Sequence, residues 1–327
     1  MHDVIAIGDM SIDVFLEMNK KEADIHCSVR HEDCKICFNY ADKIPVEAMV
    51  RTIGGNSANI AVGVRRLGLK SAMVTNLGKD EEGQVCRKAL WHERVDTRFI
   101  DFNKRTNLST VINYLGERTI FIYHEEREYR LPSLPKSRYI YFSSMKKGWD
   151  VVIDPLVKYL DRHKVKLAYN PGTYQLRDGA KLSAPLLSRC EIFYVNREEA
   201  ILFTGQKEDV SYTELFDALH KLGPKIVVIT DGPKGSYVSD GEQQYVLGIF
   251  DVPVIERTGC GDAFATGFLV AIMEGKSLTD AMRWGSFESA AVLQEIGPEA
   301  GLLRKHELAN YEKKYPNFTA KTLSKKH

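Results

Sequence analysis

The sequence predicts an α/β protein, a three-layer αβα sandwich around a mostly parallel central sheet. Apolar runs of strand length recur at Val4–Gly8, Ser71–Leu77, Arg138–Ser143, Lys166–Asn170, Ile192–Asn196 and Lys225–Thr230. Helical patterns lie between them at Asn56–Leu67, Glu81–Arg94, Trp149–His163, Arg197–Phe203 and Tyr212–Leu222. Fully apolar runs are typical of parallel strands buried on both faces. Their alternation with helices is typical of a sheet covered on both sides.

The chain from Asp262 onward has a helical pattern. We expect helices at Asp262–Glu274, Leu278–Leu293 and Lys305–Lys313. A polar end follows from Thr319 to His327, and chain ends of this kind tend to fray.

Two segments interrupt the alternation and predict a second, smaller sheet. Residues 14–53 are long, polar and mixed in character, and Leu108–Leu115 and Arg118–His124 are strand patterns joined at Gly116-Glu117. We expect them to pair as a lid over the carboxyl ends of the parallel strands, where open α/β sheets bind ligands. The main domain would then comprise residues 1–13, 54–107 and 125–327, and the inserted β lid residues 14–53 and 108–124.

Composition excludes several classes of function. The 327 residues carry 45 Lys and Arg against 44 Asp and Glu, a net charge of +1, so no nucleic-acid partner is expected. No apolar run approaches the ~20 residues of a spanning helix, and the N-terminus has no signal-peptide pattern. We therefore expect no membrane partner and a cytoplasmic location. The six cysteines are too sparse for a disulfide scaffold, and we expect them to remain thiols.

A glycine turn near residue 260 places a carboxylate where a phosphate would bind. Gly259-Cys260-Gly261 connects a strand-like run to a helical pattern, and Asp262 follows directly. The free N–H groups and the dipole of a helix N-terminus attract anions, and glycines let a phosphate approach the backbone. A carboxylate beside bound phosphate suits a base that takes a proton from a substrate hydroxyl. The alternative is that Asp262 simply caps the helix.

A second glycine turn precedes the helical pattern that ends at Leu67. It reads Gly54-Gly55-Asn56-Ser57-Ala58-Asn59, and its two amides can donate and accept hydrogen bonds as hydroxyl-rich ligands require. Here too the alternative is structural, with Asn56 or Ser57 as the helix cap. Upstream, the first strand is followed by Gly8 to Asp13. A carboxylate there could bind two sugar hydroxyls, although a turn-forming Asp is the commoner use.

Taken in order, these motifs resemble those of the ribokinase-like, or phosphofructokinase-B (PfkB), carbohydrate kinases. The resemblance covers nearly the whole chain, through Gly8 to Asp13, Gly54 to Gly68, Asn196 to Glu199, Thr230 to Gly235 and Thr258 to Gly267. It implies a kinase with a small β lid, ATP and Mg²⁺.

The resemblance also implies a role for each matching position. Asp262 matches the catalytic base, and Gly259, Cys260 and Gly261 match the anion hole. The positions that match the acceptor site are Asp13, Gly55, Asn56 and Asn59. Those that match the nucleotide-phosphate site are Asn196, Thr230, Gly232 and Gly235. Glu199 matches the residue that organises Mg²⁺, which we expect it to do through a water molecule. Considered alone, Glu199 is a solvated carboxylate at a helix start.

Two departures from the family pattern concern the last motif. Cys260 stands where relatives usually have alanine, and we interpret it as a tolerated small residue and not as a nucleophile. Many relatives begin the motif with Asp-Thr-Thr and bind a monovalent cation, whereas this chain has Glu256-Arg257-Thr258. The Arg257 guanidinium either replaces that cation or faces solvent, so a monovalent-cation requirement stays open.

The predicted lid also contains a cluster of metal-binding residue types. The members are His26, Cys27, His31, Cys34 and Cys37. Four of them could hold Zn²⁺ tetrahedrally. We do not favour zinc, because the spacing is irregular and the family needs no such metal. The alternative is a set of lid thiols and surface histidines.

The predicted reaction is transfer of the ATP γ-phosphate to a primary hydroxyl of a sugar. A nucleoside kinase is the rival, because Phe38, Tyr40, Tyr114 and Phe121 could stack on a nucleobase or merely pack the lid. A catalytically silent ligand-binding relative is the alternative from another class. A polar lid edge also suggests a homodimer formed by pairing of two lids.

Overall fold

The central sheet confirms the predicted fold class. The computed structural model describes residues 1–19, 21–27, 34–115 and 117–323. A ten-stranded sheet runs in the order β16-β15-β14-β13-β12-β11-β10-β1-β6-β7. Its parallel strands are β1 (His2–Ile7), β6 (Ser71–Leu77), β7 (Asp96–Phe102), β10 (Ser137–Phe142), β11 (Lys166–Tyr169), β12 (Cys190–Asn196) and β13 (Ile226–Thr230). An antiparallel edge adds β14 (Ser236–Ser239), β15 (Gln244–Leu247) and β16 (Lys321–Thr322).

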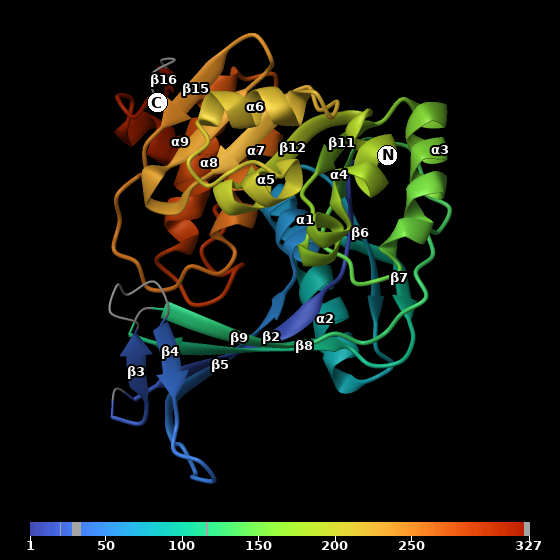
Figure 1. Ribbon diagram of the computed structural model, residues 1–327. Helices are drawn as coiled ribbons and strands as arrows, with labels where there is room; N and C mark the ends of the chain where they lie inside the picture. The colour runs from blue at the N-terminus through green and yellow to red at the C-terminus, as the bar shows by residue number, and fades with distance from the viewer. Residues whose placement is uncertain (20, 28–33, 116, 324–327) are drawn as a thin grey trace.

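Helices cover both faces of this sheet (Figure 1). One core cluster joins it to α3 (Ile153–His163), α4 (Thr173–Leu187), α5 (Arg197–Thr204) and α6 (Tyr212–His220). Opposite lie α1 (Asn56–Arg66), α2 (Glu81–His92), α7 (Cys260–Met273), α8 (Leu278–Val292) and α9 (Lys305–Lys314). In β1, Ile5 and Ile7 face the first set, whereas Val4 and Ala6 face the second. This two-sided burial explains why the strands are apolar throughout.

The smaller sheet lies across the carboxyl ends of the parallel strands (Figure 1). Its order is β5-β2-β8-β9. Its strands are β2 (Ser11–Met18), β5 (Val46–Gly54), β8 (Asn107–Tyr114) and β9 (Glu117–Tyr123). Only the central β2–β8 pair among these neighbours is parallel. A separate hairpin pairs β3 (Asp24–Cys27) with β4 (Cys34–Cys37). Because β2 begins at Ser11, Ser11 to Asp13 lie in the smaller sheet, although we expected them in the main domain.

Several elements have no counterpart in the predicted pattern. Helix α4 contains Pro185 and a non-helical kink at Gly179, so its apolar spacing is broken. The first four residues of the predicted helix Trp149–His163 form a 3₁₀ turn (η1, Trp149–Val152) before α3, and Gly232–Lys234 forms a 3₁₀ turn (η2) that was not predicted. Strands β7, β14, β15 and β16 were also not predicted. Of these, β7 and β16 are edge strands, and β14, β15 and β16 are only 4, 4 and 2 residues long, too short for a clear apolar pattern.

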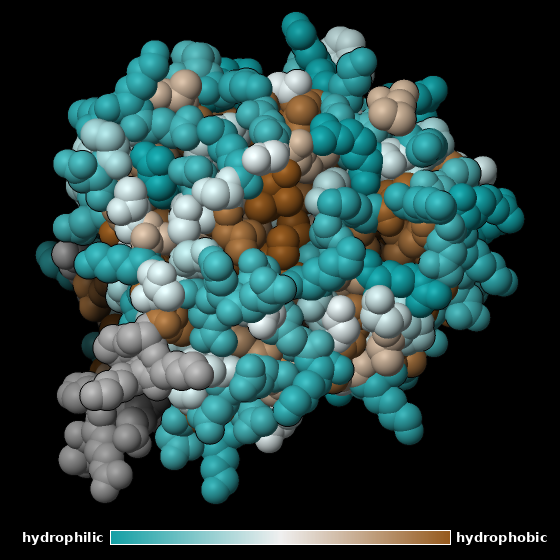
Figure 2. Space-filling model, turned by 90° about the horizontal axis from the view of Figure 1, so that it is seen from above, coloured by the Kyte–Doolittle hydropathy of each residue, from teal (hydrophilic) through white to brown (hydrophobic). Residues whose placement is uncertain are grey.

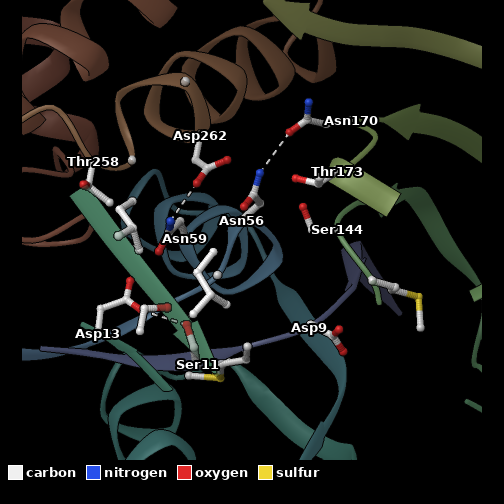
Figure 3. Close-up of a pocket in the computed structure, with 18 of the residues that line it drawn as sticks. Asp9, Ser11, Asp13, Asn56, Asn59, Ser144, Asn170, Thr173, Thr258 and Asp262 are labelled. Atoms are coloured by element: carbon white, nitrogen blue, oxygen red, sulfur yellow. Dashed lines mark hydrogen bonds between the residues drawn. The ribbon is translucent and has the colours of Figure 1, made fainter. Parts of the chain in front are cut away.

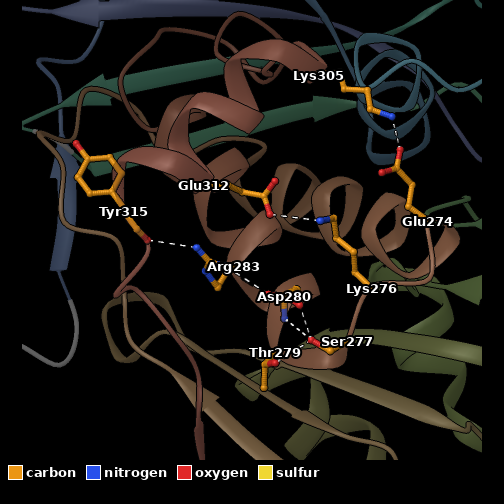
Figure 4. Close-up of polar contacts among 9 residues, drawn as sticks. All are labelled: Glu274, Lys276, Ser277, Thr279, Asp280, Arg283, Lys305, Glu312 and Tyr315. Atoms are coloured by element: carbon orange, nitrogen blue, oxygen red, sulfur yellow. Dashed lines mark hydrogen bonds and ion pairs between the residues drawn. The ribbon is translucent and has the colours of Figure 1, made fainter.

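Polar contacts attach α9 and the chain after it to the helices beneath (Figure 4). Lys305 pairs with Glu274 at 2.6 Å, and Lys276 pairs with Glu312 at 3.4 Å. Arg283 donates to the carbonyl of Tyr315 at 3.3 Å. Helix α9 is thereby fixed over α7 and α8, which carry part of the site described below.

The face opposite the smaller sheet is mostly hydrophilic, with apolar areas between its polar side chains (Figure 2). Among the described residues, no helix has the length and apolar character needed to cross a membrane.

Candidate active site

A cleft of about 780 Å³ separates the smaller sheet from the ends of the parallel strands. Alternate residues of the smaller sheet face into it, as the two-residue period of a strand requires. They are Ser11 and Asp13 of β2, Asn107, Ser109 and Val111 of β8, and Arg118, Ile120 and Ile122 of β9. The smaller sheet is therefore one wall of the cleft, and Asp13 and Asp262 approach the space from opposite sides (Figure 3).

Asp262 lies in the first turn of α7 and is only 8% exposed. The helix cap is Gly259, in the left-handed region at φ 83°, and no side chain caps the helix. The alternative in which Asp262 is the cap is therefore wrong. The pKa of Asp262 is raised to about 7, mainly by burial; a hydrogen bond from Asn59 opposes the rise, and the nearby Glu199 and Asp13 carboxylates add to it. A carboxylate with this pKa can accept a proton near neutral pH.

Gly259 is required for two reasons. Its positive φ disfavours any side chain, and a Cβ there would lie 2.4 Å from Cβ of Pro298. A Cβ on Gly261 would meet nothing within 4 Å. Burial raises the pKa of the Cys260 thiol to about 12, which keeps it protonated and supports its interpretation as a tolerated residue.

The second glycine turn faces the same cleft from α1. Its cap is Gly55 at φ 105°, again without a side-chain cap, so the alternatives with Asn56 or Ser57 as cap are wrong. Asn59 donates from Nδ2 to Oδ2 of Asp262 at 2.7 Å, and its own Oδ1 is buried without a partner among the described residues. Asn56 donates to Oδ1 of Asn170 at 3.3 Å. The Asn59–Asp262 bond thus joins the two turns directly.

Asp13 is 6% exposed and accepts a hydrogen bond from Ser11 Oγ at 2.8 Å. Burial raises its pKa. Sequence reasoning missed a second carboxylate in this wall, Asp9, which also lines the cleft. Tyr129 donates to its Oδ2 at 2.6 Å, whereas its buried Oδ1 has no partner among the described residues. The sequence signal for Asp9 was its position directly after Gly8, which ends the first predicted strand.

A second pocket of about 320 Å³ opens beside the first. It contains Thr230, Gly232 and Gly235 from the turn after β13, and Ser286, Ser289, Ala290 and Leu293 from α8 and its end. Both pockets include Thr230, Arg257, Gly261 and Phe264. A Cβ on Gly235 would lie 2.1 Å from the Leu247 carbonyl oxygen, so this tight turn requires glycine. The two pockets therefore meet at the start of α7.

Asn196 and Glu199 line the larger cleft at the start of α5. Asn196 Oδ1 accepts from the Glu199 N–H, and Glu199 Oε2 accepts from the Asn196 N–H, both at 2.8 Å. This is a capping box, so Glu199 stabilises the start of α5 whatever else it does, but its carboxylate is not the solvated one of the alternative interpretation. Burial raises its pKa. No group of three or more His, Cys, Asp or Glu suited to a metal occurs within the described ranges.

The cysteines of the hairpin differ from expectation. Cys27 and Cys34 form a disulfide, so the expectation that all six cysteines remain thiols is wrong for this pair. Their sulfurs are consequently not free as zinc ligands. Cys37 is an exposed free thiol, His26 pairs across the hairpin with Lys35, and His31 lies outside the described residues.

Curated relatives match most of the chain. An ATP-dependent 6-phosphofructokinase of Thermoanaerobacterium thermosaccharolyticum is 22% identical over 315 residues, which cover 90% of this chain and 89% of the relative. A ribokinase of Haemophilus influenzae is 26% identical over 269 residues, 79% and 86% of the two chains. A 5-dehydro-2-deoxygluconokinase of Bacillus subtilis is 27% identical over 267 residues, 74% and 81% of the two chains.

Solved structures share the fold. An Arabidopsis thaliana ribokinase complexed with ribose and ATP superposes with a TM-score of 0.75 at 20% identity, covering 94% of this chain and 98% of that one. A Burkholderia thailandensis nucleoside kinase in complex with inosine gives 0.75 at 17% identity, covering 96% and 99%. The family model of the pfkB carbohydrate kinases matches residues 1–305. The chain therefore belongs to the pfkB family of carbohydrate kinases and is a kinase.

Proposed function

We propose that this kinase transfers the γ-phosphate of ATP to a hydroxyl of a sugar, with Asp262 as the general base. The observation that carries the proposal is the position of Asp262. It is a buried carboxylate with a pKa of about 7, beside Gly261, at the junction of the two pockets. The larger pocket would hold the acceptor and the smaller one the nucleotide.

In the proposed reaction, Asp262 accepts the proton of the acceptor hydroxyl as its oxygen attacks the γ-phosphorus. The new O–P bond forms while the bond between that phosphorus and the β–γ bridging oxygen breaks, so the electron pair leaves with ADP. The free N–H groups at the start of α7 face the site of the transferring charge. The smaller sheet would exclude water, which would otherwise compete as acceptor.

The residues at the start of α5 fit a role beside Mg²⁺. In the capping box Glu199 accepts through Oε2, which leaves Oε1 for a further contact, and burial raises the pKa of this carboxylate. Asn196 and Glu199 would hold the ion through water, as Mg²⁺ retains several waters. Bound Mg²⁺ would neutralise the nucleotide phosphates.

The lining of the larger cleft favours a sugar over a nucleoside. Polar groups that suit hydroxyls line it, including Asp9, Ser11, Asp13, Asn56, Asn107 and Ser109. The aromatic residues considered for nucleobase stacking are not in its lining, whose aromatic members are Tyr123, Tyr174, Tyr194 and Phe264. Tyr114 is buried in the lid cluster with Phe38 packed against it, and Tyr40 and Phe121 are exposed. With the family shown, nothing supports the catalytically silent alternative.

The test is ADP release by the purified protein against a panel of neutral sugars, sugar phosphates, sugar acids and nucleosides. We expect a clear response to a sugar or sugar derivative. A response only to nucleosides would contradict the acceptor assignment and leave the kinase assignment intact.

We also propose that two copies pair through the smaller sheets. Strand β9 is a sheet edge, and all seven of its residues are exposed. It differs from the polar edge that we expected, since the exposed fractions of Phe121 and Ile122 are 58% and 60%. Exposed apolar edge strands favour pairing with another strand. Light scattering should give twice the mass of one chain, and Phe121→Glu, whose side chain is outside the cleft lining, should shift the mass toward the monomer.

A further inference from the structure

Two ion pairs connect the edge strand of the smaller sheet to the segment before α7. Arg118 NH1 lies 3.6 Å from Glu256 Oε1, and Arg257 NH1 lies 3.7 Å from Glu117 Oε1. Each segment supplies a glutamate followed by an arginine, and each arginine pairs with the glutamate of the other segment. Arg257 lines both pockets, so the two alternatives for its guanidinium, replacing a bound cation or facing solvent, both stay predictions. The Arg257 side chain is 51% exposed and pairs with a glutamate whose side chain is 78% exposed.

The inner pair differs from the outer pair in burial. The side chain of Glu256 is 3% exposed, and that of Arg118 is 36% exposed. A buried carboxylate is costly unless a cation or hydrogen bonds compensate its charge. Arg118 comes from the smaller sheet, so that sheet supplies a cation to a buried carboxylate of the main domain.

Glu256 in turn holds the anion-hole turn. Its Oε2 accepts from the Thr258 N–H at 2.8 Å, and its Oε1 accepts from Thr258 Oγ1 at 2.7 Å. Its own N–H donates to the Leu293 carbonyl at 3.3 Å. Thr258 immediately precedes Gly259, the cap of α7. The carboxylate that Arg118 contacts therefore fixes the backbone one residue before the proposed phosphate-binding turn.

The charges around this turn explain why a cation is needed there. In addition to burial, the charge of Glu256 raises the pKa values of Asp13 and Cys260. The charge of Arg118 lowers the pKa of Cys260, so these side chains interact electrostatically. Asp13 and Glu199 both act on Asp262. Without Arg118, the acidic side chains of the cleft would face one another and the incoming phosphates with less compensation.

We propose that Arg118 is a positioning residue, a cation carried by the smaller sheet that holds Glu256, and through it the turn from Thr258 to Gly261, in the geometry for phosphoryl transfer. The inference rests on the proposed function of that turn. Its consequence is that closure of the sheet over the acceptor and completion of the anion hole are one event, because the same strand that covers the cleft supplies the cation.

The experiment compares Arg118→Ala, Arg118→Lys and the control Arg51→Ala. Arg51 also joins the smaller sheet to the main domain, through Glu82 at 2.9 Å, and its side chain is similarly exposed at 39%, yet it contacts α2 and not the turn. We expect Arg118→Ala to lower kcat by at least about tenfold, since small misplacements of reacting groups cost up to ~100-fold. Arg118→Lys should recover part of that loss. Arg51→Ala should stay within about twofold of the parent.

A second measurement separates positioning from substrate contact. Hydrogen–deuterium exchange in the peptide spanning residues 254–263 should increase in Arg118→Ala and remain unchanged in Arg51→Ala. The binding constant of ATP, measured by calorimetry, should change less than kcat. A higher KM for the acceptor with unchanged kcat and unchanged exchange would overturn the proposal, because Arg118 would then contact substrate and not the turn.

The outer pair offers a test that does not remove the buried contact. Glu117→Arg should weaken the coupling by placing two cations together, and the double variant Glu117→Arg with Arg257→Glu should restore it. Exchange is the readout for these variants, because Arg257 also lines both pockets and a glutamate there would disturb phosphate binding. Failure of the double variant to recover the exchange would count against coupling through this strand. If the parent protein releases no ADP with any acceptor, the proposed function fails, while the exchange measurements still decide whether the sheet orders the turn.

Discussion

The glycine turns before α1 and α7 use the same backbone device for different purposes. Each helix begins at a left-handed glycine, Gly55 or Gly259, without a side-chain cap, so each leaves N–H groups free toward the cleft. The turn before α1 is followed by amides, Asn56 and Asn59, whereas the turn before α7 is followed by a buried carboxylate. The backbone therefore makes both helix N-termini suitable for anions. The polar side chains that follow decide whether a helix N-terminus only binds the substrate or also takes part in the reaction.

The largest expected effect comes from removing the carboxylate that distinguishes the turn before α7. Asp262→Asn keeps the size and the hydrogen bond with Asn59 but cannot accept the proton. We expect turnover to fall by about 10²–10⁴, the contribution typical of a general base. Steady-state ADP release measures the change, and calorimetry with ATP should show that nucleotide binding survives. Activity close to that of the parent would remove Asp262 from the mechanism.

The next prediction compares two glycines of the turn before α7, one needed for its backbone conformation and one needed for space in the site. Gly259→Ala forces a Cβ into the left-handed region and against Pro298. We expect a loss of about 1–3 kcal/mol in the free energy of unfolding together with a loss of activity. Gly261→Ala places its methyl in open space at a helical position, so the protein should keep its stability.

Because Gly261 lines both pockets, its alanine variant should nonetheless lose activity. Thermal unfolding and ADP release, measured on both variants, distinguish the two roles. Equal destabilisation of the two variants would mean that the turn does not have the conformation described here.

The parts of the site that can be predicted from sequence are those that a local motif determines. The two glycine turns, Asp262 and the turn after β13 were predictable, because glycine and the strand-to-helix order fix where they lie. The choice between a cap and a functional residue was not, since it depends on the backbone angles of Gly55 and Gly259.

Long-range contacts explain most of the remainder. The Arg118–Glu256 pair joins the smaller sheet to the segment before α7, and Arg118 is not part of a recognisable motif. Asp9 acquires its role only through Tyr129 and Lys146, which bring hydrogen bonds from distant loops. Helix α4 escaped prediction for a local reason, because Gly179 and Pro185 break its periodicity.

A smaller effect tests the bond that joins the two turns. Asn59→Ala removes the donor that lowers the pKa of Asp262, so this pKa should rise above about 7. The base must be deprotonated to act, so the rate falls as pH drops through this pKa. The acid limb of the kcat/KM profile should therefore move to higher pH, by about half to one unit for a hydrogen bond of ordinary strength.

Asn56→Ala is the matched control for this shift. Asn56 lies in the same turn, but its amide donates to Asn170 and not to Asp262. Its loss should raise the KM for the acceptor and leave the acid limb in place. An acid limb that moves equally in both variants would indicate a general disturbance of α1. An acid limb that does not move in Asn59→Ala would mean that the group titrating in the rate profile is not Asp262.

The smallest expected effect concerns the carboxylates behind the two turns. Asp13 contacts the turn before α1 and accepts a hydrogen bond from Ser11, whereas Glu256, before α7, has the guanidinium of Arg118 nearby. Since the chain supplies a cation of its own to Glu256, we expect the rate of ADP release to be the same in potassium and choline chloride at equal ionic strength. In Arg118→Ala the carboxylate loses that cation, and potassium should then raise the rate. Activation of the parent protein by potassium would mean that Arg118 leaves room for a bound ion beside Glu256. The turn before α7 would then differ from the turn before α1 in binding a metal ion.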